Sequence, residues 1–326
     1  MSRYYQSGLG QYKPVSSEIT GYAASTLVYL RRETGDDRYL DAGRRAATFL
    51  AACGWNAAAG AFPFEIDDSG GVSPAYFFDT GIIVRGLLAA GRVTRDETHC
   101  LTARQGAESM RDFLGDFDIH PVLDLPSKRP LPHGASWSRR PGCYQLKSAM
   151  AWHEVGEHSL YERALERALA TEESFLPGDD SRERVMDRLH AYCYFLEGLL
   201  PALDKPECRR AMARGVRRAG ELFDDISPVF VRSDVIAQLL RLRLLGDALG
   251  VLPLDEDAAR AGIAALPGFQ LSSPDPRIDG GFCFGRKCGA DLPFVNPVST
   301  AFAVQALSMW EQHKAGRFDP GHHHLI

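Results

Sequence analysis

The segment Tyr76-Phe-Phe-Asp79-Thr-Gly81-Ile-Ile-Val-Arg85-Gly-Leu-Leu-Ala-Ala90 places an acidic residue at the start of a long apolar run. This run is apolar on nearly every face of a helix, which is typical of a helix that is buried all round. Residues 21–30, 191–200 and 300–310 have the same character. The sequence therefore predicts buried helices with polar or aromatic groups at or near their starts.

Six apolar helices are predicted in all. Their starts lie near residues 18–22, 76–80, 144–147, 189–192, 232–234 and 296–300. A second kind of helix, amphipathic and heavily charged, alternates with them. These helices are predicted over residues 38–53, 98–114, 160–175, 207–223 and 255–266. They are expected to cover an inner apolar layer and to face water.

The connections between helices differ in length. Each apolar helix leads to its amphipathic partner through a short link, which predicts antiparallel hairpins. The return connections are often long, as at 54–75, 115–142 and 267–295, and long connections are often functional. This alternation predicts an all-α fold, an α/α toroid of about six helical hairpins in a single domain over 1–326. The outer helix that pairs with the sixth apolar helix is expected to be short or to come from a terminal segment. A two-domain helical bundle is the alternative fold.

The helical pattern resembles the (α/α)6 toroid of six-hairpin glycosidases, polysaccharide lyases and sugar epimerases. Residues 76–81 are similar to the Asp-x-Gly start of a catalytic helix in unsaturated-glucuronyl hydrolases. Residues 279–286 resemble the Gly-Gly-Phe/Trp turns of terpenoid cyclases and prenyltransferase β-subunits, which use a related toroid. The chain lacks the Asp-x-Asp-Asp motif of the cyclases and a convincing Asp…Cys…His zinc set. The resemblance implies an enzyme of the carbohydrate-active type.

Composition excludes some classes of protein. The chain has 326 residues and a net charge of −5, so there is no basic field for nucleic acid. No run reaches the roughly 18 apolar residues of a membrane span, and residues 1–8 lack the apolar core of a signal peptide. The seven scattered cysteines predict reduced thiols. We expect a cytoplasmic protein with no membrane or nucleic-acid partner, no cofactor and no metal site.

Asp79 is the first candidate for an acid or base, because the next two turns contain almost no other polar group than Arg85. Helix capping is the alternative role for this side chain. Glu18 and Asp234 are candidate partners, since paired carboxylates can divide acid and base work. A first-turn dipole role for Glu18, and a cap or an ion pair with Arg232 for Asp234, are the alternatives.

His190 and Tyr192 complete the predicted catalytic set. A histidine whose pKa lies near neutral suits proton transfer, and a tyrosine can abstract a proton or stack on a sugar ring. A hydrogen-bonded core histidine and a structural aromatic are the alternatives.

The predicted substrate-binding residues carry aromatic, amide or cationic groups at helix starts or in the long connections. They are Tyr22, Tyr76, Trp137, Arg139, Tyr144, Gln145, Lys147, Arg232, Phe282, Arg286 and Asn296. Aromatic groups beside cations suit a sugar that carries a carboxylate, because the arginine fork matches carboxylate geometry. In the alternative, the aromatic residues attach long connections to the helices and the charges are solvated.

These residues predict a hydrolase, lyase or epimerase that acts on a small or oligomeric saccharide, for which a uronate is one option. The sequence leaves the reaction type and the oligomeric state open. A non-catalytic glycan- or protein-binding toroid and a terpenoid or prenyl-group enzyme are the alternatives.

Overall fold

A computed structural model of the chain describes residues 1–66, 73–179 and 181–326. The predicted long connection 54–75 includes residues 67–72, which lie outside the described residues. Contacts divide the chain into two compact units. Unit 1 comprises residues 1–3, 14–168 and 323–326, and unit 2 comprises residues 4–13 and 169–322. A single domain over 1–326 stays a prediction.

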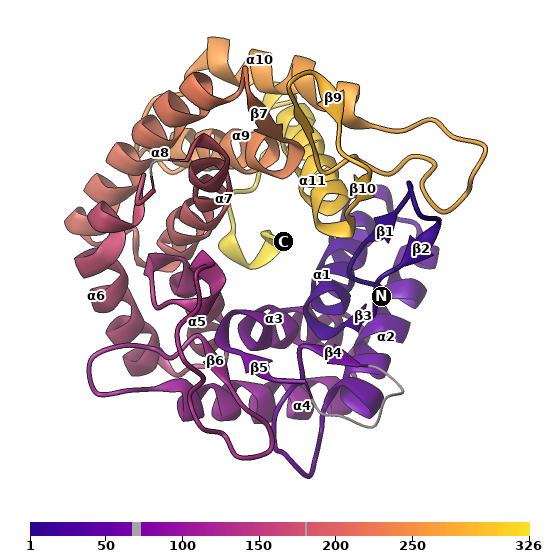
Figure 1. Cartoon of the computed structure of the whole chain (residues 1–326), viewed down its shortest axis with the longest axis vertical. Coiled ribbons are helices and arrows are strands. Elements are labelled where there is room, and N and C mark those ends of the chain that lie inside the picture. The colour runs from indigo at the N-terminus through magenta and orange to yellow at the C-terminus, as the bar shows by residue number, and fades with distance from the viewer. Residues whose placement is uncertain (67–72, 180) are drawn as a thin grey trace. The chain divides into compact units, whose positions relative to one another are not determined.

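Unit 1 consists of helical hairpins (Figure 1). Its helices are α1 (Ser17–Thr34), α2 (Asp37–Phe49), α3 (Phe77–Thr94), α4 (Glu97–Ser109), α5 (Leu146–Glu154) and the first part of α6 (His158–Phe175). Helix α2 continues as a π-helical turn over Leu50–Gly54, and α4 as a 3-10 turn over Met110–Phe113. Further 3-10 turns lie at Trp137–Arg139 and Cys143–Gln145.

Burial separates the two predicted kinds of helix. Nearly all of α3 is buried, and α3 packs against α1 and α5. Helix α2, in contrast, buries only Gly43 and Ala47. Two of the charged outer helices, α2 and α4, begin at aspartate caps. The Asp36 side chain accepts a hydrogen bond from the Arg38 amide, and Asp96 caps α4 in the same way.

Two glycines allow α1 and α3 to approach closely. A Cβ atom on Gly86 would lie 2.4 Å from the Gly21 carbonyl oxygen, and one on Gly21 would lie 2.9 Å from Ile83 Cα. Backbone atoms cannot move aside as a flexible side chain can. The contact between these helices therefore requires glycine at both positions.

Gly86→Ala is expected to destabilise the protein by about 1–3 kcal/mol, because α1 and α3 must move apart. Urea denaturation measures the change in the free energy of unfolding. Gly262→Ala, in helix α10 (Glu256–Ala265), is the matched control. The added Cβ would lie 3.6 Å from Ile236 Cγ2, which is an ordinary van der Waals distance. This control is expected to be neutral or stabilising by about 0.5–1 kcal/mol. Equal effects of the two substitutions would show that the close approach is not required.

Short strands that the sequence did not predict lead into the inner helices of unit 1. Strand β3 (Val15–Ser16) precedes α1 and pairs with β4 (Glu65–Ile66). Strand β5 (Ala75–Tyr76) precedes α3 and pairs with β6 (Val122–Leu123). All these pairs are antiparallel. They attach the long connections to the starts of α1 and α3, where the predicted acidic residues lie.

Unit 2 has the same organisation (Figure 1). Its helices are the rest of α6, α7 (Arg182–Gly198), α8 (Pro206–Ile226), α9 (Ser233–Ala248), α10 and α11 (Pro297–Lys314), with 3-10 turns at Leu200–Ala202 and Leu266–Phe269. A last 3-10 turn, His322–His324, begins at the end of unit 2 and continues into the C-terminal segment of unit 1. Its strands are β1 (Tyr5–Gln6), β2 (Gln11–Tyr12), β7 (Phe230–Arg232), β8 (Gly285–Lys287), β9 (Ala290–Asp291) and β10 (Phe294–Val295). They form two antiparallel sheets, in the orders β10-β1-β2 and β7-β8-β9.

The predicted start of the fourth apolar helix is wrong. Helix α7 begins at Arg182, so His190 lies in the middle of the helix and not at its start. Residues 182–184 are exposed and charged, and burial becomes continuous only from Leu189 onward. The apolar pattern reports burial, and a helix can begin two turns before it becomes buried.

Across residues 1–66, 73–179 and 181–326, no helix combines the length and the apolar character that crossing a bilayer requires.

Candidate functional site

The starts of α1 and α3 bring two predicted carboxyl groups together in unit 1. Glu18 is the second residue of α1 and Asp79 the third residue of α3. The charge of Glu18 raises the pKa of Asp79. Helices α1 and α3 pack directly against each other, so this electrostatic effect indicates that the two carboxyl groups lie at the same end of the helix pair.

Asp79 is only 6% exposed. It does not occupy the N-cap position, which is Tyr76, but its side chain accepts a hydrogen bond from its own backbone amide in the first turn of α3. Its Oδ2 atom has no hydrogen-bond partner among the described residues. Burial, and next the charge of Glu18, raise the Asp79 pKa well above its ordinary value. Asp79 therefore holds its proton more tightly than an exposed aspartate does.

Glu18 is half-buried. Burial raises its pKa from 4.5 to about 7, although the nearby Arg3 guanidinium opposes this shift. Arg3 lies 3.7 Å from Glu65 and stacks on Phe64, with 4.9 Å between its Cζ atom and the ring centroid. Near pH 7 Glu18 exchanges its proton readily. Burial shifts the pKa of both carboxyl groups upward, which is the kind of environment in which acid and base roles can be divided.

Aromatic residues and a cation from the long connections lie near this pair. Burial and then the charge of Asp79 raise the pKa of Tyr76, whereas Arg139 lowers it. The same two causes raise the pKa of Tyr144, whose hydroxyl donates to the Arg140 carbonyl oxygen at 3.1 Å. Trp137 packs edge-on against Tyr144, with ring centroids 4.9 Å apart. Tyr76 and Tyr144 therefore share an electrostatic environment with Asp79.

Three other predicted residues of unit 1 have partners within the fold. Gln145 accepts a hydrogen bond from the Gly142 amide and donates one to the Ile119 carbonyl oxygen. Lys147 is fully buried, and its Nζ atom donates to the Ile326 main-chain oxygen at 3.0 Å. Tyr22 is 2% exposed within α1. Their substrate-binding roles stay predictions.

In unit 2 a second set of predicted residues forms an ionic cluster at the start of α9. Arg232 donates two hydrogen bonds to the Asp234 carboxylate, at 3.0 and 2.7 Å. It also pairs with Asp187 at 2.8 Å and stacks on Phe284. Burial raises the pKa of Asp234, but Arg232 and His190 outweigh that effect and hold the pKa below its ordinary value. Asp234 therefore stays ionised, paired with Arg232 as its alternative role predicted.

His190 lies beside this cluster. Its Nδ1 atom is 2.8 Å from Gln238 Oε1 and 3.6 Å from Asp234 Oδ2. Burial lowers its pKa to about 4, against the opposing charge of Asp234. The imidazole is consequently neutral at pH 7, and Gln238 helps to fix its orientation.

The remaining predicted residues of unit 2 have separate partners. The Tyr192 hydroxyl donates a hydrogen bond to Glu172 at 2.7 Å, whereas His190 is paired with Gln238. Asn296 caps α11 by accepting a hydrogen bond from the Val298 amide at 2.8 Å. Arg286 pairs with Asp291 at 2.7 Å, and Phe282 is only 1% exposed. Their functional roles also stay predictions.

Several residues next to these groups were missed in the sequence. Gln238 and Asp187 had a readable signal, since Gln238 lies four residues after Asp234 and Asp187 three residues before His190 on their helices. Arg3 and Glu65 had no such signal in the sequence, because strand pairing brings them to the start of α1 from other segments.

No protein-family model matches the sequence. No curated protein matches it either.

Solved structures do match. A sugar epimerase from a ruminal bacterium is similar with a TM-score of 0.70 at 10% identity, over 94% of this chain and 91% of that one. A cellobiose 2-epimerase from Spirochaeta thermophila has a TM-score of 0.68 at 13% identity, over 90% and 86%. A glycosyl hydrolase of family 88 from Bacteroides vulgatus has 0.59 at 14% identity, over 90% and 91%. The chain therefore has the predicted all-α, α/α-toroid fold.

Proposed function

We propose that this chain is a carbohydrate-active enzyme that hydrolyses a glycosidic bond with Asp79 and Glu18. Support for the substrate class comes from the similar structures, which include sugar epimerases, glycosyl hydrolases and a polysaccharide lyase. Support for the reaction comes from one observation above all. A buried carboxyl group with an unpartnered oxygen lies beside a second carboxyl group whose pKa is about 7.

The two groups divide the work of hydrolysis according to their surroundings. Burial and the charge of Glu18 raise the Asp79 pKa, which favours the protonated form that can donate to the oxygen of the leaving sugar. Glu18 is ionised above about pH 7, so it can activate a water molecule or attack the sugar carbon. The proton that Asp79 loses is replaced from the attacking water when the cycle closes.

The same observation weighs against the other classes. Burial of two carboxyl groups costs stability, and ionisable groups with shifted pKa values gather at catalytic sites. The pair therefore favours an enzyme over a purely binding protein. Ionisable groups at the inner helix starts also disfavour a terpenoid or prenyl-group enzyme, which needs an apolar cavity.

The test of the proposal is a screen of the purified chain against a panel of neutral and uronate-containing oligosaccharides. New reducing ends, detected chemically and by mass spectrometry, report hydrolysis. Loss of the activity in both Asp79→Asn and Glu18→Gln supports the proposal. An activity that persists in both variants overturns the assigned residues.

The pKa of Glu18, about 7, leads to a predicted pH dependence of this activity. The value of kcat/KM is expected to rise as pH increases through about 7, where Glu18 ionises, and to fall at higher pH where Asp79 loses its proton. In Glu18→Gln the residual activity should lose the limb near pH 7. A limb that stays in place in this variant would assign it to another group.

Stability provides a second measurement of the same pKa. Between pH 4.5 and about 7, folded Glu18 keeps a proton that the unfolded chain has released. The free energy of unfolding should therefore fall as pH rises through this range, and Glu18→Gln should flatten the dependence. Urea titrations at pH 5 and pH 8 provide the comparison.

Epimerisation of a sugar is the second candidate function, and His190 favours it. A neutral buried imidazole beside a carboxylate can remove a proton from carbon. Its pKa of about 4 makes it a weaker base than Glu18, whose pKa is about 7, so hydrolysis remains the first choice. Reaction in deuterated water separates the two: deuterium on the sugar carbon without new reducing ends, abolished by His190→Gln, would establish epimerisation.

A further inference from the structure

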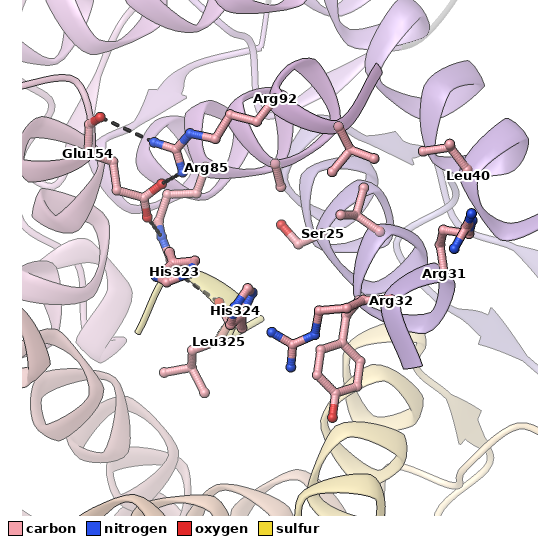
Figure 2. A pocket seen from close by; sticks show the side chains of 14 residues that line it. Ser25, Arg31, Arg32, Leu40, Arg85, Arg92, Glu154, His323, His324 and Leu325 are labelled. Carbon is pink, nitrogen blue, oxygen red and sulfur yellow. Dashed lines mark hydrogen bonds and ion pairs between the residues drawn. The ribbon is translucent and has the colours of Figure 1, made fainter. Parts of the chain in front are cut away.

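A cavity of about 540 Å³ lies in unit 1, lined by the second halves of α1 and α3 and by the C-terminal segment (Figure 2). This volume is ample for a small organic molecule. Of the described residues that line it, four are arginines and one, Glu154, is acidic. The arginines are Arg31, Arg32, Arg85 and Arg92. We propose that this cavity is a binding site for a small organic anion that carries a carboxylate or phosphate group.

The cavity is distinct from the Glu18–Asp79 pair. Arg32 follows Glu18 by fourteen residues on one continuous helix, which corresponds to about 20 Å along its axis. The same reasoning places Arg92 about 20 Å beyond Asp79 on α3, while Ser25 and Arg85, the lining residues nearest the pair, lie about 10 Å beyond Glu18 and Asp79. The inference therefore does not depend on the proposed hydrolysis.

Guanidinium groups exceed carboxylates around the cavity. Arg85 and Arg92 share one partner: Arg85 Nε lies 2.8 Å and Arg92 Nη1 3.0 Å from the two oxygens of Glu154. Arg31 and Arg32 pair with Asp37 and Glu33, which do not line the cavity. The four arginines exceed the carboxylates of Glu154, Asp37 and Glu33 by one positive charge, which favours the binding of an anion.

The position of Arg85 is not explained by helix stability alone. Arg31, Arg32 and Arg92 lie in the last turns of their helices, where cations complement the helix dipole. Arg85 lies in the middle of α3 and is only 6% exposed, so its charge is costly without partners. It spans Glu154 and the C-terminal segment, donating to the Leu325 carbonyl oxygen at 3.0 Å.

The rest of the lining suits the body of such a ligand. Val28, Tyr29, Ala89 and Leu325 supply apolar surface, and the imidazoles of His323 and His324 lie beside them. In Figure 2 the Arg32 side chain points toward His324 and Leu325, so its guanidinium is directed into the cavity and not outward. An anion held by a lining arginine would place its organic body against this apolar wall.

Calorimetric titration of the full chain tests this site. The probes are glucuronate, glucose 6-phosphate and inorganic phosphate, with glucose as the neutral comparison. We expect saturable binding of at least one anion at millimolar concentrations or below, weakened by salt, and no matching signal from glucose. The anion that binds identifies the charged group the site prefers.

Variants assign the binding to the cavity. Arg32→Gln and Arg92→Gln are each expected to lower the affinity by about tenfold or more, the loss of one charge-assisted contact. The matched control Arg44→Gln removes an exposed arginine of α2 that pairs with Asp41, and it should leave binding unchanged. Asp79→Asn should also retain binding. Absence of saturable binding by all three anions, or equal binding in Arg32→Gln and Arg44→Gln, overturns the proposal.

Discussion

Replacement of Asp79 by asparagine is expected to lower turnover by about a hundredfold to ten-thousandfold, the usual contribution of a general acid. The physical reason is that asparagine keeps the shape of the side chain but cannot supply a proton. The measurement is the rate of reducing-end release from the substrate found by screening. The variant should fold normally, which circular dichroism and thermal unfolding verify.

Stability distinguishes this result from simple damage. The Asp79 carboxyl is buried, and its Oδ2 atom has no hydrogen-bond partner among the described residues. Asp79→Asn removes a group that is costly to ionise, so at pH 8 the variant should be as stable as the parent chain or more stable. Loss of turnover without loss of stability is the signature of a functional residue.

Asp96→Asn is the matched control, because asparagine also caps a helix and Asp96 caps α4 in the same unit. Its turnover should equal that of the parent chain. Unchanged turnover in Asp79→Asn would remove Asp79 from the mechanism.

Truncation of Glu197 to alanine is expected to destabilise the protein by about 3–5 kcal/mol. Glu197 and Arg241 are both fully buried in unit 2, and their side chains lie 2.5 Å apart. Arg241 also donates to Gln305 at 2.7 Å and stacks on Phe302. Removal of the carboxylate leaves a buried guanidinium without its counter-charge, which is the costly part. Urea denaturation followed by circular dichroism measures the loss.

A double variant isolates that cause. In Glu197→Leu with Arg241→Met no charge remains, so the pair is replaced by apolar groups and most of the lost stability should return. Asp41→Ala is the control at the surface, where Asp41 and Arg44 are each 57% exposed, and it should change stability by less than about 0.5 kcal/mol. A loss below about 1 kcal/mol in Glu197→Ala would show that the guanidinium is solvated or re-paired.

The apolar runs predicted the helices well, but not all of their starts. The run near residue 81 indicated α3 correctly, because its burial begins in its first turn. The run near residue 191 placed the start of α7 too late, since the first residues of α7 are exposed and carry no apolar pattern. The short strands were missed because two-residue pairs are too short to show an alternating pattern.

The candidate site shows the same division. Asp79 and Glu18 were recognised as polar groups ahead of apolar runs, and their shared location follows from α1 packing on α3. His190 and Tyr192 are two residues apart and looked like one group in the sequence. On a helix such residues point in different directions, and the structure pairs His190 with Gln238 and Tyr192 with Glu172.

The sequence by itself determined the order of inner and outer helices, because burial and solvent contact are written directly into hydrophobic periodicity. Tertiary structure alone decided which ionisable groups share an environment and what their pKa values are. The pKa of Glu18 depends on its burial and on Arg3, which are set by packing of segments distant in the chain. Local pattern carries no information about such neighbours, and it is the neighbours that set the pKa values on which the proposed roles of Glu18 and Asp79 rest.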